Sequence, residues 1–143
     1  MTSVNEADVD DAFLSSLRAA FPNVLIGDAE KPDGATEQTG YAIVFPIPSG
    51  NRTQGPVYAR GGDSIRWVRY QLLAEGVQRN QVRRLANDLA AAVVAVDAQR
   101  AYTLAIAPTG HAVIDRRRVG SIPLDTLGTW QAGELVDLLV TIT

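Results

Sequence analysis

The start of the chain carries apolar residues at helical spacing, which predicts an amphipathic helix over about residues 4–20. Its apolar stripe consists of Val9, Phe13, Leu17 and Ala20. Ser3 and Glu6 have the spacing of a capping box, in which each side chain satisfies a free amide of the other residue. Asn5 and Asp8 offer the same start two residues later, so both starts are open.

Alternating and continuous apolar runs predict three strands before the middle of the chain. A short buried strand is expected at 24–27, a second at 41–47, and the clearest at 65–75. Pro46 and Pro48 indicate that the second strand ends there or lies at an edge of the sheet. Proline has no backbone N–H, so it cannot donate a hydrogen bond to a neighbouring strand.

The strand over 65–75 has an apolar face and a mixed face. The apolar face carries Val68, Tyr70, Leu72 and Ala74. The mixed face carries Trp67, Arg69, Gln71, Leu73 and Glu75. Since interfaces favour Trp and Arg, the mixed face is a candidate subunit interface. The alternative is that Trp67 belongs to the core, under the C-terminal segment and near Trp130.

Gly76 ends this strand, and a second helix is expected to start within 78–80. Its buried stripe consists of Val82, Leu85, Ala86, Leu89, Val93 and Val96. Arg79 and Arg83 lie outside that stripe and are candidate interface residues.

The last third of the chain is rich in residues that favour strands. Strands are expected at 102–107, 111–119 and 134–142, with a turn at Pro108-Thr109-Gly110. Residues 120–133 are expected to be irregular. The order of helix, strands, helix and strands predicts an α+β fold: a mixed, mainly antiparallel sheet of about four or five strands with two helices on one face. No internal repeat or boundary is visible, so residues 1–143 are expected to form one domain.

The segment 49–64 has the composition of a loop, with four glycines, Pro56, Arg52 and Arg60. A loop of this length is uncommon in a compact domain. One interpretation is a flexible hairpin tip. The other is an arm that becomes ordered against a partner, which makes Arg52 and Arg60 candidate interface residues.

Composition limits the chemistry that the chain can perform. It has 143 residues, no cysteine and one histidine, His111, so thiol catalysis and thiolate metal sites are excluded. A histidine-based triad would have to use His111, which lies beside a predicted turn, and no phosphate-binding loop is present. We therefore expect no enzyme, no cofactor and no metal. The N-terminus has no signal-peptide pattern and no apolar run could span a bilayer, so a soluble protein is expected.

The basic residues do not by themselves indicate nucleic-acid binding, since the net charge is −3. In the run Arg116-Arg117-Arg118, the outer two side chains would point one way and the middle one the other. The run either keeps an edge strand soluble, or forms a salt-bridge face in an oligomer or the lining of a DNA channel. The arginines of the second helix could join that surface or pair with the acidic first helix of a neighbour.

One region resembles a known family. The segments 67–76, WVRYQLLAEG, and 79–89, RNQVRRLANDL, form an aromatic-Gln strand that ends at a Gly and leads into an amphipathic helix. This pattern, the Gly-rich segment before it and a final strand resemble the tail-terminator (minor tail, head–tail joining) proteins of siphophages of actinobacteria. The order of elements fits over most of the chain, except for 102–133.

The resemblance implies a structural protein that forms a ring, expected to be a hexamer, which caps the tail tube and then joins the tail to the head. The implied partners are the major tail tube protein, a connector protein of the head and neck, and DNA passing non-specifically through the lumen. The implied location is the tail–head junction of the virion, after assembly in the bacterial cytoplasm. Alternatives are another neck or head-completion protein, or a small-ligand-binding or carboxylate-based enzyme domain.

Overall fold

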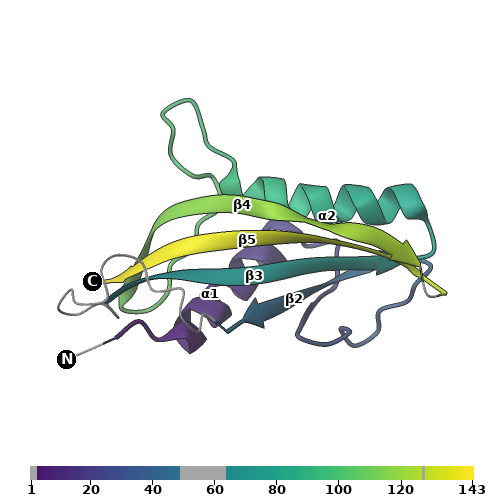
Figure 1. Ribbon diagram of the computed structural model, residues 1–143, viewed down its shortest axis with the longest axis horizontal. Coiled ribbons are helices and arrows are strands. Elements are labelled where there is room, and N and C mark those ends of the chain that lie inside the picture. The colour runs from purple at the N-terminus through teal and green to yellow at the C-terminus, as the bar shows by residue number, and fades with distance from the viewer. Residues whose placement is uncertain (1–2, 49–63, 127) are drawn as a thin grey trace.

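The computed structural model describes residues 3–48, 64–126 and 128–143, which form an α+β fold (Figure 1). The elements in chain order are α1 (Glu6–Ala20), β1 (Ile26–Asp28), β2 (Tyr41–Ile47), β3 (Ile65–Gly76), α2 (Arg79–Val94), β4 (His111–Thr126) and β5 (Trp130–Ile142). The predicted fold class is confirmed. The bounds of β2 match the prediction, and those of β1, β3 and both helices lie within two residues of it.

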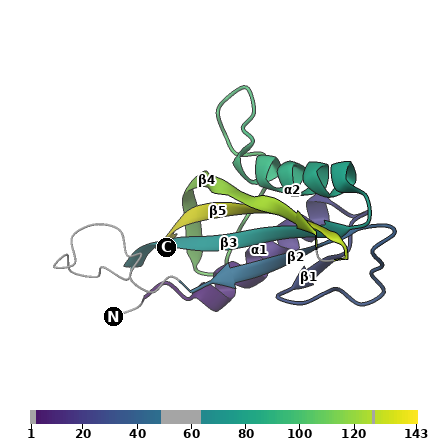
Figure 2. The same ribbon diagram turned by 45° about the vertical axis from the view of Figure 1, so that its right-hand side comes forward.

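The five strands form one mixed sheet in the order β1-β2-β3-β5-β4. Only β1 and β2 are parallel, and the other pairs are antiparallel, as expected. Turning the molecule shows β1 beside β2 at one edge of the sheet (Figure 2). The β1 ladder reaches only as far as Val44 of β2, so Pro46 lies where β2 pairs with β3 alone. At Pro46, β2 is therefore locally an edge strand, as the proline predicted.

The main core joins both helices to one set of strand side chains. The strands contribute Ile26, Ala42, Val44, Val68, Tyr70, Leu72, Val136, Leu138 and Val140. The helices contribute Val9, Phe13, Leu14, Leu17, Leu89, Ala90 and Val93. At the centre, the rings of Phe13 and Tyr70 stack with centroids 4.3 Å apart. The Tyr70 hydroxyl donates a hydrogen bond to Asp10 Oδ1 at 2.5 Å, so the buried phenol has a partner.

Helix α1 starts at the second of the two predicted positions. Asn5 is the N-cap, and its side chain accepts a hydrogen bond from the amide of Ala7. The backbone amide of Asn5 in turn donates to Nε2 of His111 at 3.0 Å. His111 Nδ1 lies 2.7 Å from the Thr109 carbonyl oxygen, so the ring carries its proton on Nδ1. The single histidine therefore ties the start of α1 to the start of β4.

Two predictions for the last third of the chain are wrong. Residues 120–126 and 130–133 belong to strands, because β4 continues to Thr126 and pairs, with a register shift between Ile122 and Asp125, with a β5 that starts at Trp130. Residues 102–107 are not a strand; within the described residues, Tyr102 forms one isolated bridge with Val96. Leu104 and Ile106 nevertheless pack into the core, so their alternation reflects burial without a ladder. No helix in the described residues has the length and apolar character needed to cross a membrane.

Candidate interaction surface on the outer face of the sheet

The mixed face of β3 points away from the main core, and we call this side of the sheet the outer face. In register with β3, strand β5 places Leu139, Asp137, Leu135, Gly133 and Gln131 opposite Trp67, Arg69, Gln71, Leu73 and Glu75. On the other side, β2 places Ile47, Phe45, Ile43 and Tyr41 opposite Arg69, Gln71, Leu73 and Glu75. In Figure 1, α1 lies behind these strands. The outer face is thus a broad sheet surface with both apolar and charged side chains.

A buried carboxylate lies at the centre of the charged part of this surface. Asp137 has no exposed side-chain area, yet it belongs to the outer face. Arg69 donates to it twice, from Nε to Oδ1 at 2.7 Å and from Nη2 to Oδ2 at 3.1 Å. Arg117 of β4 donates to Oδ2 from Nε at 3.1 Å, and its Nη2 lies 3.0 Å from the same oxygen. Two guanidinium groups from flanking strands therefore enclose one carboxylate.

This arrangement changes the acidity of Asp137. Burial alone would raise the pKa of the carboxyl, because it disfavours the charged form. The hydrogen bonds from Arg69 and Arg117 outweigh burial, so the pKa of Asp137 lies below its ordinary value. The hydrogen bonds that Arg69 donates to Asp137 also raise the pKa of Arg69. At neutral pH the cluster therefore holds two positive charges and one negative charge.

Trp67 lies next to this cluster and is covered by it. The Arg117 guanidinium carbon is 4.0 Å from the centroid of the Trp67 ring, a cation–π contact. Trp67 is only 7% exposed, although it belongs to the outer face. The prediction that Trp67 packs near Trp130 is wrong. Trp130 is in register with Gly76, at the other end of β3, and contacts Arg79 of α2. Trp67 is therefore buried, with the half-exposed Arg117 side chain in contact with its ring.

Half-buried apolar side chains surround the charged cluster. Phe45, Ile47, Leu73, Leu135 and Leu139 all belong to the outer face. Toward the β1 edge, Tyr41 and Ile43 are covered by Ala35 from the segment between β1 and β2. The Tyr41 hydroxyl also donates to Glu75. Within the described residues, this corner of the outer face is therefore closed by the chain itself.

The three consecutive arginines of β4 do not form one basic patch. Arg116 and Arg118 point away from the outer face and Arg117 toward it, as strand geometry predicted. Arg116 is 9% exposed, donates from Nη1 to the Val93 carbonyl oxygen at the end of α2, and stacks on Tyr102. Burial lowers its pKa. The Arg116 side chain thus supports the end of α2. It is not available to line a DNA channel, which was one of the roles considered for this run.

The remaining predicted residues lie in separate places. Gln71 is on the outer face beside Arg69. Arg79 and Arg83 are exposed on the first turns of α2, on the other side of the sheet. Arg52, Arg60 and the segment 49–63 lie outside the described residues. The sequence did not single out Asp137, since a lone acid in a strand gives no signal of the arginines that will face it.

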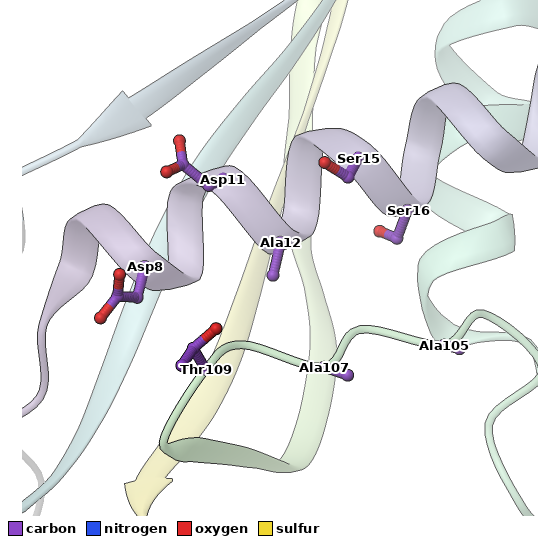
Figure 3. Close-up of a pocket in the computed structure, with 8 residues that line it drawn as sticks. All are labelled: Asp8, Asp11, Ala12, Ser15, Ser16, Ala105, Ala107 and Thr109. Atoms are coloured by element: carbon purple, nitrogen blue, oxygen red, sulfur yellow. The ribbon is translucent and has the colours of Figure 1, made fainter.

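The surface also has open hollows. One of about 470 Å³ lies between α1 and the segment before β4, lined mainly by Asp8, Asp11, small side chains and Thr109 (Figure 3). Another of about 500 Å³ lies between α2 and the β4–β5 hairpin. No three potential metal ligands gather anywhere in 3–48, 64–126 or 128–143.

In comparisons with known proteins, no family model and no curated protein gives a significant match to this chain.

Proposed function

We propose that this protein is a structural component of a phage tail that forms a ring, caps the tail tube to end its growth, and joins the tail to the head. The sequence support is the resemblance of 67–76 and 79–89 to tail-terminator proteins. The structural observation that supports the proposal is the outer face. There two arginines enclose Asp137, and half-buried apolar side chains lie around this cluster.

The outer face has the chemistry of a protein interface rather than of a reaction centre. Aromatic residues and arginine are enriched where proteins meet, and Trp67, Arg69 and Arg117 lie side by side here. Because Asp137 already neutralises one guanidinium, a partner needs to supply only one more negative charge when it covers the cluster. The leucines around the cluster supply apolar area to bury.

Within this proposal the partners are further copies of the chain, the tail tube protein and a connector protein of the neck. DNA passes through the ring without sequence-specific contacts. The protein then acts at the tail–head junction of the virion after assembly in the host cytoplasm. The nearest alternative is a different connector or head-completion protein of the neck.

The test has two parts. Native mass spectrometry of the purified chain should show a closed oligomer, expected to be a hexamer. Adding the protein to growing tail tubes should then stop their elongation, with the ring visible at one end by electron microscopy. A ring that binds a neck protein but leaves tube growth unchanged would support the other connector, and a strictly monomeric chain would reject the proposal.

A further inference from the structure

The cleft between α2 and the β4–β5 hairpin is polar and partly enclosed. Arg83 and Asn87 of α2 line one side, and Arg118, Ser121 and Glu134 of the hairpin line the other. These residues are brought together only by the packing of α2 against the sheet, since they are far apart along the chain. The chemistry of the cleft depends on which of its donors and acceptors are already used.

The acceptors of the cleft have partners within the protein. The Glu134 side chain is 10% exposed, and its Oε1 accepts from Arg118 Nη2 at 2.6 Å. Its Oε2 accepts from the Ser121 hydroxyl at 2.7 Å. Asn87 Oδ1 accepts from Arg118 Nη2 at 3.2 Å. Each of these oxygens thus carries a hydrogen bond, and Glu134, the one acidic side chain among the described residues that line the cleft, is neutralised.

The donors of the cleft are in excess. Arg83 is exposed and has no ion pair with any residue that the structure describes. The Asn87 amide group makes no hydrogen bond within the described ranges, and Arg118 uses only one of its three guanidinium nitrogens. A cleft with free N–H groups and satisfied acceptors fits a ligand that only accepts, and a carboxylate is such a ligand.

The same chain carries unpaired carboxylates on another surface. Asp8 and Asp11 line the hollow beside α1, and Figure 3 shows both carboxylates on the surface of the helix. Within the described residues neither has an ion pair. They differ from Asp10, which is bound to Tyr70. The chain thus presents a free acidic surface that matches its own basic cleft in charge.

The two surfaces are separate within one molecule. The hollow beside α1 and the cleft have no lining residue in common. Within the described residues no ion pair joins Asp8 or Asp11 to Arg83 or Arg118. The hollow lies against the segment before β4, whereas the cleft lies between α2 and the later part of β4.

We propose that the cleft lined by Arg83 and Arg118 binds the α1 carboxylates Asp8 and Asp11 of a second copy of this chain. When two different surfaces of one molecule meet between copies, they give a head-to-tail contact, which produces a ring when its rotation closes. The inference rests on the proposed ring and assigns one of its contacts. It leaves the outer face available for the tube or the neck.

Charge reversal and its repair test the contact. Arg83→Glu alone and Asp11→Arg alone should each weaken self-association at least tenfold at low salt, measured by native mass spectrometry and sedimentation. The double variant, Arg83→Glu with Asp11→Arg, should recover most of the association, because the opposite charges meet again with exchanged signs. Arg100→Glu is the matched control: it makes the same charge change at an exposed turn beyond the other end of α2 and should change nothing.

The outcomes separate this contact from the ring itself. A wild-type ring that persists unchanged in both single variants would overturn the inference and leave the proposed function intact. Rings that break in the single variants and return in the double variant, but do not cap tail tubes, would support the contact and reject the terminator role. A wild-type chain that stays monomeric would overturn both. If Arg83→Glu abolished binding to a short DNA duplex without affecting association, the cleft would be a phosphate site and the inference would fall.

Discussion

Arg69 holds both carboxylate oxygens of Asp137 from the neighbouring strand, at 2.7 Å from Nε and 3.1 Å from Nη2. The two residues are register partners in the β3–β5 ladder, so the pairing of the strands sets this geometry. Asp137 is fully buried, and Arg117 approaches it from the opposite strand. Because a buried charge is stable only when it is paired, this cluster makes the outer face depend on the correct register of three strands.

Asp137→Asn should destabilise the fold by about 1–3 kcal/mol, since it leaves two guanidinium groups without their carboxylate but in partial contact with water. Arg117→Ala should cost less, about 1 kcal/mol, because the Arg117 side chain is 49% exposed. Urea unfolding followed by circular dichroism measures both. The exposed Asp33→Asn is the control and should be neutral. Equal losses for Asp137→Asn and Asp33→Asn would contradict a stabilising role for the cluster.

The same cluster predicts acid sensitivity. The pKa of Asp137 lies below its ordinary value in the fold, so its contribution to stability is complete above the unfolded pKa, about 3.9. That contribution is lost as the pH falls through the lower, folded pKa. The unfolding free energy should therefore drop below about pH 4, and less steeply in Asp137→Asn. Identical pH profiles for the variant and the wild type would show that Asp137 does not contribute.

Trp67→Ala should weaken self-association or partner binding while the secondary structure remains. Trp67 is covered on the outer face by Arg117, and a central Trp at an interface contributes about 2 kcal/mol or more, roughly thirtyfold in affinity. Sedimentation equilibrium gives the oligomer size and circular dichroism the fold. An unchanged oligomer with a lower melting temperature would assign Trp67 to the core of the single chain.

Gly133→Ala should destabilise the β4–β5 hairpin by about 1–3 kcal/mol. A Cβ at Gly133 would lie 2.9 Å from Cδ1 and 3.1 Å from Cβ of Ile122, the residue in register with it. Adding Ile122→Gly, which removes both contacting carbons, should remove most of the extra cost of Gly133→Ala, as a double-mutant cycle by urea unfolding would measure. Gly120→Ala is the matched control, because nothing lies within 4 Å of a Cβ there. Equal effects at both glycines would show that close packing is not the reason.

Local sequence patterns predicted the helices and strands that have one buried face and one exposed face. The helical stripe of α1, the alternation in β3 and the end of β3 at Gly76 all agree with the structure. Gly76 is needed for space, since a Cβ there would lie 3.1 Å from Val82 Cγ2 and 3.3 Å from the Glu37 carbonyl oxygen. A sequence can show that a strand stops at a glycine, but not which atoms approach it.

The sequence by itself determined the fold class, most element positions, and the absence of cysteine and of more than one histidine. Only the tertiary structure decided that 120–126 and 130–133 belong to paired strands, because their ladder joins residues with no strong local pattern. It also decided the roles of the charges. Arg69 lies 68 residues and Arg117 20 residues from Asp137, and burial makes such distant pairs strong. Local periodicity encodes which face of an element is buried, whereas the partners across that face are set by how the elements pack.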